Sequence, residues 1–357
     1  MPTAKEVEKE ATAAAAAPPP RMDRIPTHCK AVDTLCDGGL ATGTITQIFG
    51  EKALGKSIIS LQAACATAAA GASAIVLDTE QSYSSYLMPY WKGNMGRRFG
   101  KEVKVVDLKA ERVPKSEKKN KTVTRGQLIT ELGSTLNRLG VAYTDAHLGS
   151  IANTLSPEFD VKLEEGTGPS VLVLQVPEVT DLLNLHGIDA AKEVSEGGRV
   201  ELRLRSTPTY QSVLHQVIRR TNTKLLIYDS ISAPFKASFP STQDLPARSA
   251  GIAMILAHAQ RLCAEFGIAV LVISHVSIDP IKAWDRVPYG GVILGHDAKF
   301  SLELTKATAT RNGHMNPQPI NPEEEEGSAK AFWVARHPAM AEYSKFGYAR
   351  IDEEGFH

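Results

Sequence analysis

A glycine-rich stretch, FGEKALGKS at residues 49–57, carries the clearest chemistry in this chain. It has the pattern GxxxxGK[ST], in which Gly50 and Gly55 let backbone N–H groups approach phosphate oxygens because no Cβ stands in the way. Lys56 would reach the β and γ phosphates of a nucleotide, and the hydroxyl of Ser57 would bind Mg²⁺. The alternative is an ordinary turn between a strand and a helix, so the neighbouring sequence has to decide.

Two acidic residues at the ends of apolar runs could complete a nucleotide site. Asp229 ends LLIYD, where a strand-end aspartate would hold Mg²⁺ through water, although a lone aspartate there can equally cap a turn. Glu80 ends SAIVLDTE (73–80), beside the edge of the sheet at which ligands of open α/β sheets bind. It could orient water for hydrolysis, or it could be a surface acid at a strand end.

The elements around these residues predict a parallel α/β sheet. Residues 45–49 form a short strand, the alanine-rich residues 57–71 fit a buried helix, and 73–80 is a β-branched run. Strand, glycine loop, helix and strand make the start of a βαβ sheet. Further strands are predicted at 170–176, 224–230, 268–274, 299–304 and 330–335, with a long helix at 246–266 that ends at Gly267.

The chain divides into a tail, a core in two parts and an insertion. Residues 1–21 are low in complexity and rich in alanine and proline, which predicts a disordered tail. We assign 22–99 and 179–357 to the core and 100–178 to the insertion, because a βαβ core needs far less chain between its second and third strands. An amphipathic helix is expected near 126–140 within it.

The insertion begins with a hydrophilic, basic loop at 109–126. Its cations are Lys109, Arg112, Lys115, Lys118, Lys119, Lys121 and Arg125, against Glu111 and Glu117. A solvated loop is the preferred interpretation because charge runs usually are that, and an auxiliary DNA-binding patch is the alternative.

Composition excludes several classes of protein. The 357 residues are 43% hydrophobic and 22% charged, which is typical of a soluble globular chain. Lysine plus arginine equals aspartate plus glutamate, 40 each, so any affinity for nucleic acid must come from a local patch. Neither a signal peptide nor an apolar run of membrane length is found. We therefore expect no membrane partner and a location in the cytoplasm, or in the nucleus of a eukaryote.

Cysteine usage indicates a reducing compartment with buried thiols. The four cysteines, which form no CxxC motif, are Cys29, Cys36, Cys65 and Cys263. His28 with Cys29 and Cys36 could be part of a metal site, but a fourth ligand is missing, so core packing is preferred.

The chain resembles the RecA/RadA recombinase family, archaeal paralogues included. The resemblance is carried by THCKAVDTLCDGGLATGTITQIFGEKALGKS, IVLDTE, LLIYDSISAPFK, LPARSAGIAMILAHAQRLCAEFGIAVLVISHV, GGVILGHDAKFSLEL and YARIDEEGF. It implies a RecA-type P-loop NTPase core of the α/β class, with a mostly parallel central sheet flanked by helices and an inserted subdomain. It also implies ATP and Mg²⁺ as cofactors and single-stranded DNA as a partner bound through two loops.

Roles follow from this resemblance position by position. Glu80 matches the glutamate that activates water, Asp229 the Walker B acid and Ser57 the second metal ligand. His275 stands where the family usually has a glutamine that senses the γ-phosphate, and a satisfied histidine at a strand end is the alternative. The residues assigned to ATP are Gly50, Glu51, Lys52, Ala53, Leu54, Gly55, Lys56, Ser57, Ile58, His275 and Pro338, the last in an adenine-capping segment.

The resemblance also implies a DNA-binding face. Lys236 and Arg248 flank the first loop, and the second loop lies between Val276 and Tyr289. Its candidate contacts are Lys282, Trp284 and Arg286, and Trp284 could stack on a base. A solvated loop with one exposed aromatic residue fits the second segment equally well.

The sequence departs from the family pattern at several places. Ala53 and Leu54 replace glycine-containing family positions in the P-loop, and Arg336 stands where an aspartate is usual before Pro338. The tail is too short for the family's N-terminal domain, and the first phenylalanine, Phe49, lies inside the core rather than before it. A self-assembled filament is therefore in doubt, although a homo-oligomer stays open.

We expect an accessory recombinase-like ATPase that binds ATP–Mg²⁺ and single-stranded DNA and assists homologous recombination and repair together with a main recombinase or other repair proteins. Two alternatives stay open. One is a KaiC-like signalling ATPase without a DNA role, and the other is a mediator that holds ATP without hydrolysing it and acts through protein contacts.

Overall fold

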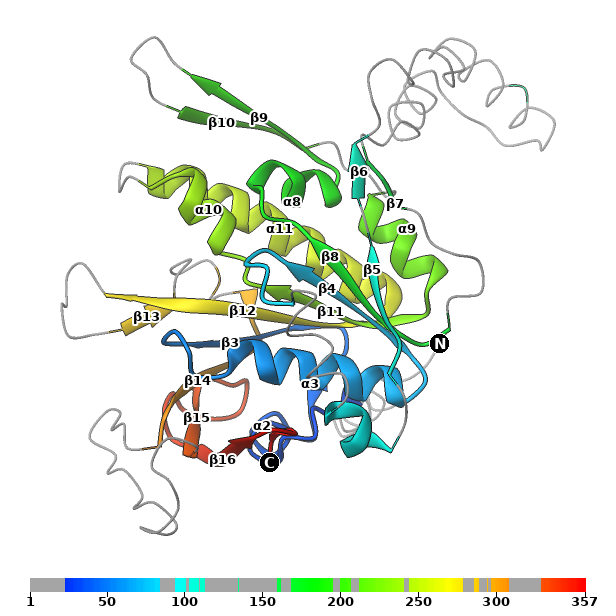
Figure 1. Cartoon of the computed structure of the whole chain (residues 1–357). Helices are drawn as coiled ribbons and strands as arrows, with labels where there is room; N and C mark the ends of the chain where they lie inside the picture. Colours follow the sequence, from blue (N-terminus) through cyan, green and yellow to red (C-terminus); the bar gives the residue numbers. More distant parts are fainter. Residues whose placement is uncertain are drawn as a thin grey trace, which may run out of the picture.

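The computed structural model describes residues 23–83, 94–100, 103–108, 110–112, 134, 159–161, 168–194, 200–206, 212–240, 244–278, 286–288, 294, 297–307 and 329–357. Its central sheet runs in the order β17-β16-β15-β14-β3-β12-β11-β4-β8-β5 (Figure 1). The strands of this sheet are β3 (Ile45–Gly50), β4 (Ser73–Asp78), β5 (Val105–Leu108), β8 (Val171–Gln175), β11 (Thr223–Asp229), β12 (Ala269–Ile278), β14 (Phe300–Lys306), β15 (Ala329–Arg336), β16 (Phe346–Asp352) and β17 (Gly355–Phe356).

The middle of the sheet is parallel and one end is antiparallel. Strand β3 pairs in parallel with β14 and β12, and the parallel pairing continues through β11, β4, β8 and β5. From β14 outward, β15, β16 and β17 pair antiparallel. The predicted mostly parallel α/β sheet is confirmed. Its strands are continuous β-branched runs because helices bury both faces of the sheet.

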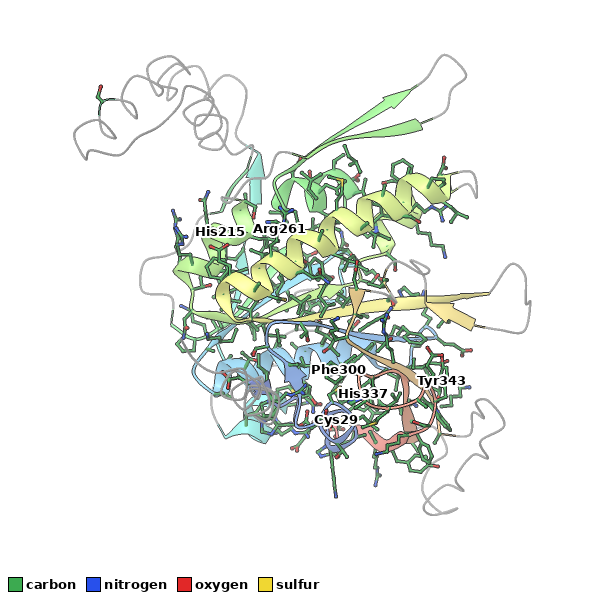
Figure 2. All side chains as sticks on the ribbon, turned by 180° about the vertical axis from the view of Figure 1, so that it is seen from behind. Cys29, His215, Arg261, Phe300, His337 and Tyr343 are labelled. Atoms are coloured by element: carbon green, nitrogen blue, oxygen red, sulfur yellow. The ribbon has the colours of Figure 1, made fainter. Side chains whose placement is uncertain are left out.

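Helices cover both faces of the sheet (Figure 1). One face packs against α3 (Lys56–Ala69) and α2 (Lys30–Leu35), whose apolar side chains join a single buried cluster with β3, β14 and β15. The other face is covered by α8 (Val179–Leu185), α9 (Val213–Arg220), α10 (Ala233–Ser238) and α11 (Leu245–Phe266). Figure 2 views the molecule from behind, with His215 and Arg261 labelled on the side of the sheet that α11 covers and Cys29 and His337 on the other side.

Helix α11 matches the helix predicted at 246–266 and ends where predicted. Its last residue is Phe266, and Gly267 adopts a left-handed conformation with φ 59° and donates its N–H to the carbonyl of Cys263. Glycine is favoured at such a position because a Cβ would be strained there. The strands predicted at 45–49, 73–80, 170–176, 224–230, 268–274, 299–304 and 330–335 are likewise present, as β3, β4, β8, β11, β12, β14 and β15.

The expected boundaries of the insertion need correction. Strands β5 and β8 lie within 100–178, yet both belong to the central sheet, where β8 pairs with β4 and β5 pairs with β8. Their apolar faces are buried in the sheet's core clusters, so the ends of the range belong to the core. The helix predicted near 126–140 and most of the basic loop lie outside the described residues, and the intervening segment stays a proposed insertion.

Three small sheets lie off the main path. They are β1 (Arg24–Ile25) with β2 (Leu40–Ala41), β6 (Ala110–Arg112) with β7 (Phe159–Val161), and β9 (Ile188–Val194) with β10 (Val200–Ser206). All three pairs are antiparallel. The strand β13 (Arg286–Pro288) pairs antiparallel with the end of β12, which makes a hairpin there.

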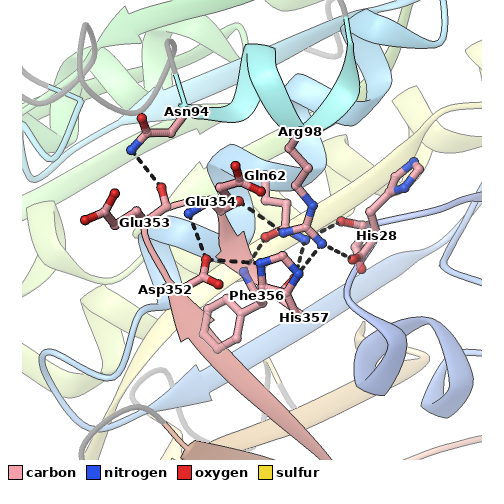
Figure 3. A network of polar contacts seen from close by, with 10 residues as sticks. His28, Gln62, Asn94, Arg98, Asp352, Glu353, Glu354, Phe356 and His357 are labelled. Atoms are coloured by element: carbon pink, nitrogen blue, oxygen red, sulfur yellow. Dashed lines mark hydrogen bonds and ion pairs between the residues drawn. The ribbon is translucent and has the colours of Figure 1, made fainter.

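The two ends of the described chain meet near the middle of α3. Gln62 bonds the backbone of Phe356 in both directions, accepting from its N–H at 2.7 Å and donating to its carbonyl at 3.1 Å. Arg98 donates to the carbonyls of Phe356 and His28, each at 2.7 Å (Figure 3). Buried backbone groups of the last strand are thus satisfied by side chains from distant parts of the chain.

All four cysteines are free and buried, as their spacing predicted. Burial raises the pKa of Cys65 to about 12, so it stays an unreactive thiol. Among the described residues, no group of three or more His, Cys, Asp or Glu side chains could hold a metal ion, and no helix there is long and apolar enough to cross a membrane.

Candidate nucleotide-binding site

The predicted phosphate loop connects the end of β3 to the start of α3. Gly55 is the N-cap of this helix, with φ 102°, and Lys56 is its first residue. The loop therefore faces the positive end of a 14-residue helix, whose free N–H groups are suited to bind phosphate. Lys56 is 5% exposed and its ammonium donates to the carbonyl of Glu51 at 2.6 Å, so its side chain bends back over the loop.

Two features of the loop explain its residue types. A Cβ on Gly55 would lie 2.8 Å from Cδ1 of Ile351 and 2.9 Å from Cζ of Phe356, so the C-terminal strands press directly on this glycine. Ala53 has φ 63°, the left-handed conformation that favours glycine. The alanine therefore carries local strain, of the order of 1–2 kcal/mol, that a glycine at this position would not have.

The side chain of Asp229 is buried beside the first turn of α3. Asp229 is 2% exposed, and its Oδ2 accepts from the hydroxyl of Tyr83 at 3.1 Å and from that of Ser60 at 3.2 Å. Burial raises its pKa to about 6, while hydrogen bonds from Ser57 and Tyr83 lower it. Ser57 and Asp229, the two predicted metal ligands, are thus brought together.

This pair fits Mg²⁺ by the chemistry of its donors. A carboxylate and a hydroxyl supply hard oxygen ligands, and Mg²⁺ usually takes one or two such groups from the protein and the rest from phosphate and water. Burial lowers the pKa of Lys56, and the nearby charges of Asp229 and Glu80 raise it. Lys56 therefore lies in the same region as the two carboxylates. The ammonium of Lys56, the carboxylate of Asp229 and the hydroxyl of Ser57 around a helix N-terminus can bind a nucleotide phosphate together with its metal ion.

Glu80 belongs to a second hydrogen-bonded group at the same edge of the sheet. Its Oε1 accepts from the hydroxyl of Ser230 at 2.6 Å and lies 2.8 Å from Nε2 of His275. The hydrogen bond from His275 is the main reason that the pKa of Glu80 is lowered, so Glu80 is ionised at neutral pH. About a third of each of the Glu80 and His275 side chains is exposed, which leaves the carboxylate accessible to water.

The strand ends themselves hold these groups in place. Thr79 Oγ1 donates to the carbonyl of Ser230 at 2.7 Å and accepts from its N–H at 2.9 Å, which ties the end of β4 to the end of β11. Asp78 accepts from the backbone N–H groups of Ser82 and Tyr83 at 3.0 and 3.1 Å. These bonds fold the segment after β4 into a turn that presents Glu80 on one side and Tyr83 on the other.

His275 reaches this site because β12 lies beside β3 in parallel. The register places His275 opposite Gly50, and Asp229 opposite Asp78 on the other side of β11. The carboxyl ends of parallel strands share one edge of the sheet, so Gly50, Asp78, Asp229 and His275 lie at that edge although they are far apart in the sequence.

Pro338 is not brought to this site within one chain. Strand β15 is antiparallel to β14, and its last residue, Arg336, pairs with Ser301, which in turn pairs with Gln47 near the amino end of β3. Pro338 therefore lies at the opposite edge, roughly 15 Å along the strand direction from the P-loop. The assignment of Pro338 to the ATP site of its own chain needs correction, and a nucleotide contact by Pro338 would require a second copy.

The candidate DNA residues are only partly described. Lys236 is exposed in the last turn of α10, which follows the carboxyl end of β11. Arg286 opens β13, opposite Ile278 at the end of β12, so both candidate loops leave the sheet at the same edge. Lys282 and Trp284 lie outside the described residues. Arg248 is 7% exposed, so a phosphate contact by its guanidinium would require its surroundings to open.

Three groups in this site were missed from the sequence. They are Ser60, Tyr83 and Ser230. Ser230 directly follows Asp229 and could have been found as the next residue of the same strand end. Ser60 and Tyr83 had no motif to mark them, because a serine in a helix and a tyrosine after a strand are common.

Fold and site together define a P-loop NTPase core of the RecA type. The chain matches the Rad51 family over residues 21–89 and 209–331, which is more than half of its length. It therefore belongs to the Rad51 family.

Curated relatives match over shorter segments. The chain is 48% identical over 56 residues to the DNA repair and recombination protein RadB of Halobacterium salinarum, which covers 16% of this chain and 24% of that protein. It is 50% identical over 60 residues to RadB of Methanoculleus marisnigri, covering 17% and 27%. It is 32% identical over 108 residues to the human meiotic recombination protein DMC1/LIM15 homolog, covering 29% and 32%. The chain thus matches about a quarter to a third of the length of these relatives.

Proposed function

We propose that the chain is an ATP-dependent accessory recombinase that binds single-stranded DNA and acts in homologous recombination and repair, and that it is a RadB-like member of its family. The observation that carries the proposal is the meeting of Lys56, Ser57, Asp229 and Glu80 at one edge of the sheet. Names that relatives carry, recombination proteins from archaea and from human, favour the same role.

The residues divide the work of ATP hydrolysis among them. The backbone of the P-loop and the ammonium of Lys56 bind and orient the phosphates, while Ser57 and Asp229 would hold Mg²⁺, which neutralises developing phosphate charge when it is bound. Glu80, held by Ser230 and His275, accepts a hydrogen bond from the attacking water and orients it. His275 lies beside Glu80 on β12, so a contact between its ring and the γ-phosphate would act directly on the β12–β13 hairpin.

That hairpin links the proposed ATP site to the proposed DNA face. His275 and Val276 follow one another in β12, and Val276 pairs with Pro288 of β13. A change around His275 is therefore transmitted along a paired strand to the candidate DNA loop. The rival signalling and mediator functions do not require a link between the ATP site and a DNA loop, because neither needs DNA.

The discriminating experiment measures ATP hydrolysis with and without oligo-dT. Stimulation by single-stranded DNA is expected for an accessory recombinase. Hydrolysis that DNA leaves unchanged would favour the signalling ATPase, and tight ATP binding without turnover would favour the mediator.

DNA binding should depend on salt and on Lys236. Each phosphate contact releases counterions, so removing the exposed cation in Lys236→Ala should lower affinity equally for different sequences and reduce the slope of log K against log salt by about one. Fluorescence anisotropy with oligo-dT at several salt concentrations measures both quantities. Lys224→Ala, an exposed lysine at the opposite end of β11, is the matched control. Absence of wild-type binding at low salt with ATP–Mg²⁺ would remove the DNA role.

Nucleotide binding should weaken in mild acid when Mg²⁺ is present. The pKa of Asp229 is raised to about 6, so its carboxylate takes up a proton as the pH falls through 6 and loses the charge that attracts a metal ion. The free protein itself should become more stable as the pH falls through this range, because the folded state binds the proton at Asp229 more tightly than the unfolded state does. Thermal shifts by ATP–Mg²⁺ between pH 5 and 8 test this, with Asp229→Asn as the variant in which the step disappears.

A further inference from the structure

Two hydroxyl groups that the proposed mechanism does not use stand between Asp229 and the P-loop helix. The hydroxyls of Tyr83 and Ser60 lie 2.6 Å apart, and each approaches Oδ2 of Asp229, at 3.1 and 3.2 Å. Tyr83 is 3% exposed and Ser60 is fully buried. Polar groups buried this deeply are costly unless they are hydrogen-bonded. Each hydroxyl has one proton to donate, and the acceptors within reach include the other hydroxyl and the carboxylate.

The same hydroxyls also touch the first turn of α3. Tyr83 lies 3.3 Å and Ser60 3.0 Å from the carbonyl oxygen of Ser57. The carboxylate from β11 and the residue whose hydroxyl would bind the metal are therefore joined through one pair of side chains. A shift of either would disturb the bonds of the other.

The contacts show how one oxygen of this carboxylate is held. Both hydroxyls approach Oδ2, and the side chain of Ser57, the other predicted metal ligand, also hydrogen-bonds Asp229. A carboxylate that is held by hydrogen-bond donors before the ligand arrives loses less freedom on binding. The backbone N–H of Tyr83 is itself bonded to Asp78 at 3.1 Å, which fixes the tyrosine at the end of β4.

We propose that Tyr83 is a positioning residue of the nucleotide site, whose hydroxyl, together with that of Ser60, orients the Asp229 carboxylate toward Mg²⁺ and ties it to the P-loop helix. The inference rests on the proposed function, since it concerns the same site. It assigns a role to a residue outside the P-loop and outside the pair of acids that the sequence marked.

The test is the Mg²⁺ requirement of nucleotide binding, measured without turnover. The melting temperature of the protein is recorded at a fixed, saturating concentration of ATP while MgCl₂ is varied, and again with ATP and EDTA. Tyr83→Phe removes one oxygen and keeps the ring. Loss of a hydrogen bond to a charged group predicts that the variant needs roughly tenfold more Mg²⁺ for half of the shift, whereas the shift with ATP and EDTA is unchanged.

Tyr228→Phe is the matched control. Tyr228 is a fully buried tyrosine on β11, and its hydroxyl bonds Nε2 of His186 at 3.2 Å in the cluster on the opposite face of the sheet. This variant should lower the melting temperature of the free protein without changing the Mg²⁺ midpoint. A merely structural role of Tyr83 would give the same pattern as the control and would overturn the inference.

Ser60→Ala gives an independent second test. If the two hydroxyls act as one unit, the double variant should need no more Mg²⁺ than whichever single variant needs more, because the effects of coupled groups are not additive. If Tyr83→Phe and Ser60→Ala need no more Mg²⁺ than the wild type for half of the thermal shift, the inference is overturned and the proposed function is not. A wild type whose melting does not respond to Mg²⁺ with ATP overturns the proposed function and the inference with it.

Discussion

Lys56→Ala should abolish the stabilisation of this protein by ATP–Mg²⁺. A ligand at about 100 times its dissociation constant adds about 2.7 kcal/mol to the free energy of unfolding. For a chain of this size that is a rise in melting temperature of roughly 4 °C. The shift should vanish in the variant because the ammonium of Lys56 is the positive side chain of the P-loop that is folded over the phosphate position.

The free protein should tolerate this substitution. Burial lowers the pKa of Lys56, so the cation is held at some cost in the absence of phosphate, and its removal relieves that cost. Melting curves without nucleotide check that the variant is folded. Lys224→Ala, at the amino end of β11, is the control that loses a lysine away from the site. A shift in Lys56→Ala equal to that of the wild type would show that the loop does not bind the phosphates.

Glu80→Gln should separate binding from hydrolysis. The amide has the shape of the carboxylate but lacks its charge and its capacity to accept a proton, so we expect turnover to fall by a factor of about 10²–10⁴. ATP–Mg²⁺ should still raise the melting temperature, since Glu80 lies beside the phosphate-binding residues rather than among them. The two readouts are single-turnover hydrolysis of ATP and the thermal shift of the same sample.

Glu178→Gln is the control for this variant. Glu178 is an exposed acid that follows β8 at the same edge of the sheet and stands before α8 without a side-chain capping bond. It should hydrolyse ATP at the wild-type rate. If Glu80→Gln also does so, the water is oriented by another group, and the hydrogen bonds of Glu80 to Ser230 and His275 are structural.

The sequence by itself determined the P-loop and the strand ends. A GxxxxGK[ST] run between an apolar strand and an alanine-rich helix is a local pattern, and local geometry follows from it because glycine alone permits the turn and the helix supplies its own N–H groups. Asp229 and Glu80 were found from neighbouring buried runs, since Asp229 ends β11 and Glu80 lies two residues beyond the end of β4. Parallel sheets place such ends at one edge.

Tertiary structure alone decided what touches these residues. The contacts of Tyr83 and Ser60 with Asp229 join residues 146 and 169 positions apart, and no spacing rule predicts them. The strand register likewise moved Pro338 to the far edge, because antiparallel pairing of β15 reverses its direction relative to β3. The insertion was drawn too wide because β5 was not predicted and the strand at 170–176 had no known partner until the pairing of β8 with β4 and of β5 with β8 was seen. Periodicity reports which face of a segment is buried, but the partner that buries it is chosen by packing of the whole chain.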